Sequence, residues 1–411
     1  MSVSPWLLDG LVVLTVSAVL LALASPRIRH SNQWQATVTP LASIIGSGFL
    51  LVAPLLHASL GKWALAGIVV LTFVAYNIGI VIRFNIVHAE VWVEEYPQGR
   101  VARIEALSQW MLGLAYTISV AFYASLLAAF VFEKLGISNG TAMRWAATGL
   151  LTGVMAVAWA RGAKGLEMIE LVAVTIKIAI IGGVLLALAY YDAATGIAWF
   201  EHEPLEPLTP YKTAAILAGM LMVTQGFETA RFMGERYTRE VRVLAVKQSQ
   251  WIATAIYVVF IGVTCPIFFR FPIAELNETA VSTTLGQVIF VLPAFLLVAA
   301  SASQLSAALA DTIGGGGLFQ QRLKTKTRLP SNAFYVIVAG MAIVLLWTAD
   351  VFELVNYASK GFAAYYLLQV VIAIGLVARR GSSNRLWLVG LVPLALLLIF
   401  VVLGSIAAPH S

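Results

Sequence analysis

The chain has 411 residues, of which 60% are hydrophobic and only 11% are charged, and its mean hydropathy is +0.89. So few charged side chains exclude a soluble globular protein and indicate a membrane protein that crosses the bilayer many times. The formal net charge of +6 does not point to nucleic acid, because the basic residues gather in alternate loops. We therefore expect the lipid bilayer as surroundings and no nucleic-acid partner.

The first apolar stretch, residues 6–25, ends in LALAS, which resembles a signal-peptidase site. A signal peptide has a basic start. This start carries Asp9 and no Lys or Arg, and the basic residues Arg27 and Arg29 follow the apolar run. The segment is therefore predicted to be an uncleaved helix with its N-terminus outside the cell.

Further apolar stretches follow to the end of the chain, and a helix needs about 20 apolar residues to cross the hydrocarbon core. No soluble domain is predicted, and the longest polar stretch lies around residues 192–212. The sequence predicts twelve spans, at residues 6–25, 36–58, 63–86, 106–132, 142–160, 166–190, 211–232, 247–269, 283–311, 332–348, 352–377 and 386–407.

The loops between these spans alternate in charge. Acidic loops carry, for example, Glu201, Glu203 and Glu206, and the loops between them are basic. By the positive-inside rule, this pattern predicts a multi-pass protein of the cell (inner) membrane with both termini outside. The basic positions are Arg27, Arg29, Arg100, Arg103, Arg161, Lys164, Arg236, Arg239, Arg242, Arg322, Lys324, Lys326, Arg328, Arg379, Arg380 and Arg385.

One span contains an interruption near its centre. ASIIGSGFLLVAPLL, residues 42–56, is apolar, yet Gly46, Ser47 and Gly48 stand in its middle. A broken helix is tolerated in a membrane where it faces protein or a water-filled cavity, and its freed amides can hold a carboxylate. Alternatively, the glycines only let two helices pack closely. This stretch alone leaves both interpretations open.

A second span, MVTQGFETARFMGER at residues 222–236, has a similar interruption. Gly226 breaks the apolar run, and Glu228 follows at membrane depth, where an ionisable group indicates a functional site. Four spans separate the two interrupted ones. If each interrupted span heads one unit of an inverted repeat, each unit has five helices. The halves show no sequence identity, so the repeat is inferred.

These stretches resemble motifs of the amino acid–polyamine–organocation (APC) transporter superfamily. IIGSGFLLVAP resembles the first-helix motif of that superfamily, and QGFETA resembles its sixth-helix motif. Between them, EEYPQGRVARIEALSQWMLGLAY at 94–116 is similar to the passage from the second helix to the third. GAKGLEMIELVAVTIKIAIIGGVLL at 162–186 is similar to the fifth helix with its embedded lysine. Together the matches cover roughly residues 36–380.

The resemblance implies an all-α polytopic membrane protein with a LeuT-type fold of two inverted five-helix repeats. The chain departs from the family at the sixth helix, where Met222 stands in place of a large aromatic gate residue. The predicted organisation is an extra N-terminal transmembrane helix at 1–30, a first repeat at 31–191, a second repeat at 192–378 and a C-terminal transmembrane helix at 379–411.

The resemblance also implies a substrate site between the two broken helices. A transported amino acid would set its carboxylate on the amides of Ser47, Gly48 and Phe49, and its ammonium on carbonyls near Val223 and Gln225. Aromatic residues at helical spacing, such as Tyr116, are by default core packing, but the resemblance places Tyr116 at the cavity. The predicted substrate-binding residues are Ile45, Gly46, Ser47, Gly48, Phe49, Tyr116, Met222, Val223, Thr224, Gln225 and Gly226.

Two ionisable residues are candidates for proton coupling. Lys177 lies about eleven residues into its span, too deep for its ammonium to reach the surface easily. The resemblance implies that this ammonium fills a cation place between the first and eighth helices, so sodium is the weaker interpretation. The alternative is a permanently charged lysine bonded to carbonyls of the broken first helix. Glu228 is predicted to be a relay or gate, or a structural acceptor for freed amides.

The remaining motifs argue against an enzyme. Gly314–Gly317 follow Asp311, but no Lys-Ser/Thr follows them and no strand precedes them, so they are predicted to be a flexible inner gate or helix end and not a phosphate loop. The histidines show no metal-ligand spacing, and no carboxylate pair suggests hydrolysis. No cofactor and no metal site are predicted.

The sequence thus predicts a secondary active transporter of a small amino-acid-like solute, an amino acid or related amine. It would work by alternating access and be proton-coupled or exchanging. The rival hypothesis is a non-transporting membrane sensor or assembly subunit that has kept a transporter fold. The oligomeric state is left open.

Overall fold

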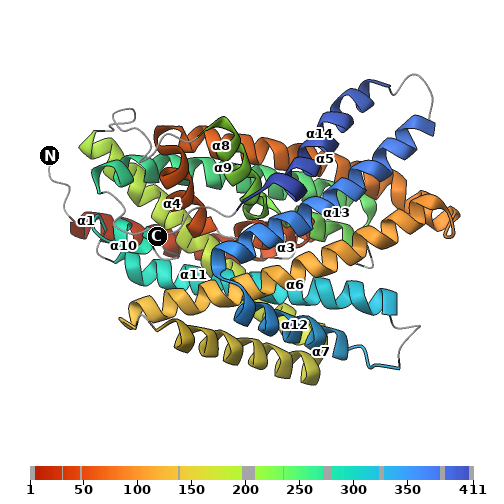
Figure 1. Cartoon of the computed structure of the whole chain (residues 1–411). Coiled ribbons are helices and arrows are strands. Elements are labelled where there is room, and N and C mark those ends of the chain that lie inside the picture. Colours follow the sequence, from red (N-terminus) through yellow and green to blue (C-terminus); the bar gives the residue numbers. More distant parts are fainter. Residues whose placement is uncertain are drawn as a thin grey trace.

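The computed structural model describes residues 5–29, 31–46, 49–137, 139–196, 209–234, 236–271, 280–289, 291–323, 328–379 and 385–406. Within these residues every regular element is helical, and the helices pack into one bundle around a shared apolar core (Figure 1). The helices are α1 (Pro5–Ala24), α2 (Pro26–Arg29), α3 (Asn32–Gly46), α4 (Phe49–Leu60), η1 (Gly61–Trp63), α5 (Ala64–Glu95), α6 (Arg100–Lys134), α7 (Gly140–Thr195), α8 (Pro210–Gly219), η2 (Leu221–Thr224), η3 (Phe227–Phe232), α9 (Arg239–Arg270), α10 (Ala280–Leu285), α11 (Leu292–Leu323), α12 (Ala333–Thr348), α13 (Val351–Arg379) and α14 (Arg385–Gly404).

Several of these helices are long and apolar enough to cross a membrane, which makes the chain a multi-pass membrane protein. By length and composition, the described residues contain six such segments, and α12 and part of α14 are shorter apolar helices. The predicted count of twelve spans stays a prediction. The six segments are Trp6–Leu23, Leu51–Glu95, Arg100–Phe132, Val172–Thr195, Arg239–Arg270 and Val351–Arg379.

The predicted spans 142–160 and 166–190 are the two arms of α7. The chain turns between them at Gly162, whose φ of 61° lies in the left-handed region that favours glycine. Asn332 fixes this corner, because its side-chain amide donates a hydrogen bond to the Trp159 carbonyl at 2.9 Å. A single glycine thus makes the joint between the two predicted spans.

The first interrupted span consists of two helices. α3 ends at Gly46 and α4 begins at Phe49, while Ser47 and Gly48 lie outside the described residues. Gly46 also packs closely, since a Cβ at this position would collide with Ala307 of α11. The close packing drawn from the sequence is thus present at Gly46, and the interruption at residues 47–48 stays a prediction.

The second interrupted span is irregular over a longer stretch. After α8 the chain forms the short 3₁₀ turns η2 and η3, and Gln225 and Gly226 between them are not helical. Gly226 has φ 123°, and a Cβ there would lie 2.6 Å from both the Ser43 hydroxyl and the Ile44 amide nitrogen of α3. Only glycine satisfies both constraints, so Gly226 lets the two breaks touch.

The predicted span 283–311 differs most from the structure. It divides into α10 and α11, and α11 runs well past Asp311 to Leu323. The expectation that Gly314–Gly317 form a flexible gate or helix end is wrong, because these glycines lie within α11. The physical reason is packing: a Cβ at Gly314 would press on the Tyr116 ring at 2.9 Å, and one at Gly316 would collide with Tyr335.

The N-terminal helix lies on the outside of the bundle. α1 packs along the second arm of α7, where a Cβ at Gly183 would be 2.7 Å from the Val16 side chain. Its opposite face is exposed, with Leu14 and Leu21 each more than 70% accessible. Leu23 in its last turn nevertheless lines the large cavity described below.

Candidate functional site

Tyr257 of α9 connects the two helix breaks. Its hydroxyl lies 3.0 Å from the carbonyl oxygen of Ile44 and 2.6 Å from that of Val223. Phe49, at the start of α4, packs its ring against Tyr257 with centroids 5.5 Å apart. The sequence analysis did not identify Tyr257.

Lys177 of α7 lies against the end of α3. Its ammonium is fully buried and donates to the Ala42 carbonyl at 2.6 Å and to the Ser306 hydroxyl of α11 at 3.1 Å. One turn closer to the break, the Ser303 hydroxyl donates to the Ile45 carbonyl at 3.2 Å. The contact of Lys177 with the first broken helix is the one predicted from the sequence, and it joins α3, α7 and α11.

Glu228 lies in the first turn of η3, and its side chain is fully buried. One carboxylate oxygen accepts a hydrogen bond from the Tyr116 hydroxyl at 3.2 Å. The other accepts bonds from the Tyr366 hydroxyl at 2.8 Å and from the Gly226 amide at 2.9 Å. Glu228 therefore accepts the amide that the break frees. Among the described residues no cation lies within ion-pair distance of it.

Gln225 occupies the break itself and is buried. Its side-chain nitrogen donates to the Tyr123 hydroxyl at 3.3 Å, while its side-chain oxygen has no hydrogen-bond partner among the described residues. Thr224 instead bonds locally, to the Leu221 carbonyl at 3.1 Å. Met222 belongs to η2, and its side chain lies outside the described part of the structure. The second break thus presents a buried acceptor that no described residue satisfies.

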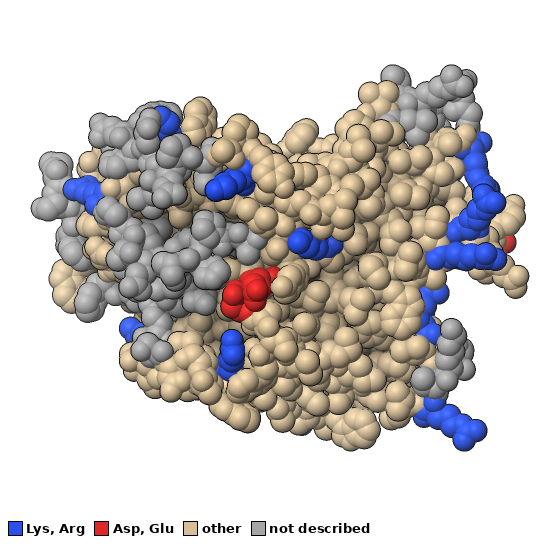
Figure 2. Space-filling model, in the orientation of Figure 1, with Lys and Arg blue, Asp and Glu red and all other residues tan. Residues whose placement is uncertain are grey.

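A large cavity of about 1580 Å³ leads towards the two breaks from one end of the molecule. Near its mouth it is lined by Trp34, Glu94 and Arg236, and its far end reaches Tyr116 and Thr229. We call this cavity the vestibule. Lys and Arg side chains gather at one end of the face in Figure 2, over the ends of α11 and α13 and the start of α6. The residues at the mouth lie beside the loops that carry these Lys and Arg side chains. The vestibule therefore opens towards this end of the molecule, which we call the basic end.

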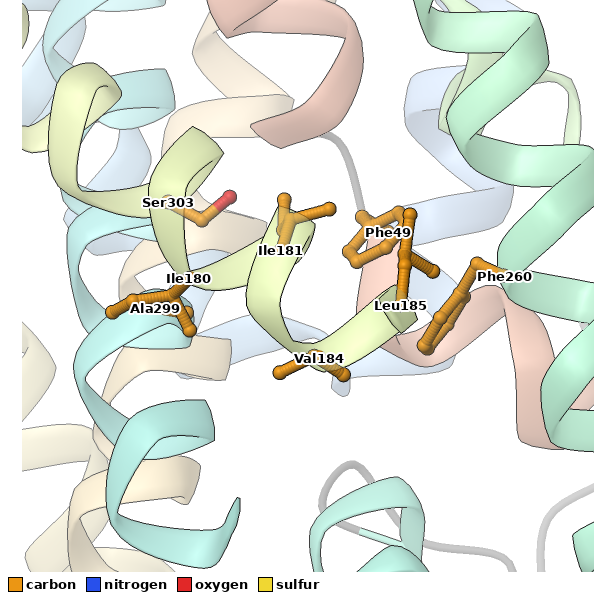
Figure 3. Close-up of a pocket in the computed structure, with 8 residues that line it drawn as sticks. All are labelled: Phe49, Ile180, Ile181, Val184, Leu185, Phe260, Ala299 and Ser303. Carbon is orange, nitrogen blue, oxygen red and sulfur yellow. The ribbon is translucent and has the colours of Figure 1, made fainter. Parts of the chain in front are cut away.

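A second, much smaller cavity lies beside Phe49 of α4. The cavity there holds only about 10 Å³, the space of roughly one water molecule. Phe49 and Phe260 stand on one side of it, and Ile180 and Ala299 on the other (Figure 3). Its lining is apolar except for Ser303. The large vestibule thus reaches the breaks from the basic end, whereas the cavity beside Phe49 is small.

A cluster of buried charges lines the vestibule beside η3, and sequence reasoning missed it. Arg231 forms an ion pair with Glu105 of α6 at 3.2 Å and also contacts Gln369 of α13. Gln369 donates to Glu105 at 3.0 Å, and Asn85 of α5 donates to the Gln369 side chain at 2.8 Å. Arg242 extends the cluster with a bond to the Arg231 carbonyl at 2.6 Å. Polar residues inside apolar spans were the available signal, but their partners lie far apart in the sequence.

The predicted site residues are thus distributed as follows. The described ones from the two breaks lie together: Gly46 and Phe49 flank the first break, and Val223, Thr224, Gln225 and Gly226 form the second. Ile45 accepts a bond from α11, Tyr116 lines the vestibule, and Lys177 and Glu228 lie at the first and second breaks respectively. Ser47 and Gly48 lie outside the described residues.

A bundle with two touching helix breaks at the end of an aqueous vestibule is the architecture of a membrane transporter. A family model described as APC superfamily transporter matches residues 26–404, and the chain belongs to this family. An "uncharacterized protein" of Aquifex aeolicus (strain VF5) is 39% identical over 403 residues, which is 97% of each chain.

Solved structures share the fold. The chain is similar to a manganese transporter of Eremococcus coleocola crystallised with an aromatic bis-isothiourea compound, with a TM-score of 0.56. The identity is 13%, and the match covers 91% of this chain and 87% of that one. A mutant of the same transporter gives a TM-score of 0.52, again at 13% identity, covering 90% and 87%. This likeness concerns the fold alone.

Proposed function

We propose that the protein is a secondary active transporter that moves a small amine-bearing solute of the amino-acid kind by alternating access. The observation that carries the proposal is the asymmetry about the breaks. A vestibule of about 1580 Å³ reaches them from one end, and the cavity beside Phe49 holds only about 10 Å³. Such a shape corresponds to one of the two states that alternating access requires, with the site facing the basic end.

The chemistry of the second break supports an amine as part of the solute. The side-chain oxygen of Gln225 and the carboxylate of Glu228 are both hydrogen-bond acceptors, and both are buried. The Gln225 oxygen has no donor among the described residues. An ammonium group supplies donors that complement such acceptors. At the first break, the amides of Ser47, Gly48 and Phe49 would take the carboxylate of an amino acid.

Tyr116 connects the vestibule with the buried acceptors of the second break. Its side chain lines the vestibule, and its hydroxyl donates to Glu228, which does not line it. In the proposed cycle Tyr116 separates the aqueous path from the second break, and its movement admits the solute. This is the role we assign to it in place of simple core packing.

The coupling ion we propose is the proton, with Lys177 as its carrier. When charged, Lys177 ties the end of α3 to α11 through the Ala42 carbonyl and the Ser306 hydroxyl. When neutral, it holds both acceptors more weakly, because hydrogen bonds to charged groups are the stronger ones. Proton loss would thus loosen α3 from its neighbours. Glu228 is the second candidate for a proton carrier.

The manganese named for the structural neighbours is not part of our proposal for this chain. Manganese prefers oxygen ligands with carboxylates among them. In the described part of the chain no group of three or more His, Cys, Asp or Glu residues could hold a metal ion. The Lys177 ammonium bonded beside the first break would also repel a divalent cation there.

The test begins with the purified full-length protein and a thermal-shift screen of amino acids, amines and manganese chloride. A ligand that binds the native state raises the melting temperature by mass action. The ligands that bind are then offered to proteoliposomes under an imposed pH gradient without sodium. We expect accumulation of at least one amine-bearing solute. Binding without any flux would overturn the proposal in favour of a non-transporting sensor, and a response to manganese alone would overturn the solute class.

A further inference from the structure

Arg83 is a charged residue on the membrane-facing seam between α5 and α9. Its guanidinium donates to the Gln250 side chain of α9 at 3.0 Å and lies over the Tyr76 ring, 4.9 Å from its centroid. Tyr76 in turn meets Trp251 edge-on with ring centroids 5.5 Å apart. Trp251 is 57% exposed, so this cluster faces the surroundings of the bundle and not its core.

The position of the Arg83 guanidinium is fixed, because the Gln250 side chain to which it donates is itself held in place. The side-chain nitrogen of Gln250 donates to the Ala75 carbonyl at 2.7 Å. Its amide fills a notch that only glycine leaves open, since a Cβ at Gly79 would collide with it. The oxygen of Gln250 therefore points to Arg83 in a fixed position, and the guanidinium is held at the seam.

The depth of the cluster follows from the register of α9. Tyr257 reaches the carbonyls of both breaks, and transporter breaks lie near the midplane of the bilayer. Gln250 precedes Tyr257 by two helical turns, about 10 Å along the axis. Lys247 lies nearly one turn further, about 15 Å from the midplane, which is the edge of the hydrocarbon core. Both positions are on the side of the breaks that faces the basic end of the molecule.

Lys247 lies on the same exposed side of α9. Its side chain is exposed, as are those of Leu244 (41%) and Trp251 before and after it. Apolar neighbours of this size on a spanning helix indicate contact with lipid. The seam thus presents two basic side chains. Lys247 lies at the edge of the hydrocarbon core, and Arg83 lies about a turn inside it.

No carboxylate of the described residues lies within ion-pair distance of Arg83. A charged arginine at membrane depth is costly unless an anion compensates it. A phosphate diester at the boundary of the hydrocarbon core has the right charge and depth, and the planar guanidinium suits its oxygens. The tail of the same lipid would lie along Trp251 and the apolar face of α9.

We propose that the α5–α9 seam is a binding site for an anionic phospholipid, with Arg83 and Lys247 holding the headgroup phosphate and Tyr76 and Trp251 flanking it. The site belongs to the leaflet at the basic end of the molecule, which in a cell membrane carries the more negative surface. α5 and α9 both pack against the second break. A lipid that fastens these helices together therefore bears on the region where the solute is proposed to bind, whatever that solute is.

The experiment uses the full-length protein in a neutral detergent, to which phosphatidylglycerol or phosphatidylcholine is added. Bound lipid is counted by native mass spectrometry, and the melting temperature is followed in parallel. We expect phosphatidylglycerol to be retained and to raise the melting temperature more than phosphatidylcholine. The double variant Arg83→Gln/Lys247→Gln should bind phosphatidylglycerol about tenfold more weakly, since each basic residue near the membrane surface adds a separate attraction.

Arg270→Gln is the matched control, because Arg270 is an exposed arginine in the last turn of the same helix, at its opposite end. It should retain phosphatidylglycerol like the parent. Lys247→Gln alone changes an exposed side chain and keeps the test usable if the Arg83 variant fails to fold. Equal retention by the double variant and the parent would overturn the proposal, as would an equal loss in Arg270→Gln. Protection by inorganic phosphate alone, at the same concentration, would show a free anion site and overturn the lipid assignment.

Discussion

The two helix breaks lie side by side, but the groups that stabilise them carry opposite charges. At the first break, the carbonyl end of α3 receives donors: Lys177 at Ala42, with Tyr257 and Ser303 one turn further on. At the second, the amide at the start of η3 meets an acceptor, the Glu228 carboxylate. Each charge has the sign that complements the exposed helix end. The comparison teaches that a broken helix in a membrane needs an outside partner for its freed groups, and that the polarity of the end selects the partner.

The largest effect is expected from Lys177→Ala, which removes the cation from the first break. The Ala42 carbonyl and the Ser306 hydroxyl lose a charged donor, at a cost of about 2–3 kcal/mol in the free energy of unfolding. Proton-driven accumulation in proteoliposomes should be abolished, while ligand binding survives. Lys177→Arg should also fail to accumulate, because a guanidinium does not deprotonate in proteins.

The control for Lys177→Ala is Lys212→Ala, because Lys212 is an exposed lysine in the first turn of α8. It should accumulate solute like the parent. If Lys177→Ala accumulates solute as well as Lys212→Ala does, Lys177 is structural only, and the proton carrier must be sought at Glu228.

The next effect is expected at Glu228, in a pair of variants that separates charge from hydrogen bonding. Glu228→Ala leaves the Gly226 amide and two tyrosine hydroxyls without their acceptor, at a cost of about 2–3 kcal/mol. Glu228→Gln keeps an acceptor oxygen and should cost about 1 kcal/mol. Chemical denaturation of the two variants measures the difference. Equal loss in both would mean that the charge itself, and not the capping of the amide, stabilises the second break.

Tyr257→Phe tests the connection between the breaks. The substitution keeps the ring that packs on Phe49 but removes the hydroxyl, and we expect a loss of about 1–2 kcal/mol. Tyr237→Phe, on a tyrosine outside the breaks, serves as the matched control for losing a phenol. A double-mutant cycle with Ser303→Ala would show whether the two donors at the end of α3 act independently. Unchanged stability in Tyr257→Phe would remove this residue from the account of the breaks.

The smallest effect on the fold, and a specific one on binding, is expected from Gln225→Leu. Its side-chain oxygen accepts nothing from the described protein, so the substitution removes no internal bond at that atom. A polar ligand found by thermal shift should bind more weakly by about 1–3 kcal/mol if its donor is left unsatisfied. Thr264→Val, in α9, is the control because Thr264 is a buried threonine outside the breaks whose hydroxyl bonds to carbonyls of its own helix. The same affinity in both variants and the parent would exclude Gln225 from the solute site.

The sequence predicted what depends on local residues. Gly226 marks a departure from helical backbone because few other residues adopt positive φ, and Lys177 stands out because ammonium groups are rare at membrane depth. The twelve spans, the inverted repeat and the site assignments remain predictions. The assignment of Ser47 and Gly48 to the substrate site also stays a prediction, because both lie outside the described residues.

The features that the sequence did not yield depend on contacts between distant segments. Asn85 meets Gln369 across 284 positions of the chain, and Arg231 meets Glu105 on a different helix. Gly314 was misjudged for a related reason. A glycine run looks flexible by itself, but beside the rings of Tyr116 and Tyr335 it leaves the room that α11 needs to continue. Local propensity was overridden by packing that only the fold brings together.

The contact of the Tyr257 hydroxyl with two carbonyls has a further consequence. A phenol carries one proton, so the carbonyls of Ile44 and Val223 compete for a single donor, and satisfying one weakens the hold on the other. A movement of α3 relative to the second break therefore changes how this one proton is shared between the two carbonyls. The phenol thus couples the positions of the two segments, and a displacement of either one is felt at the other.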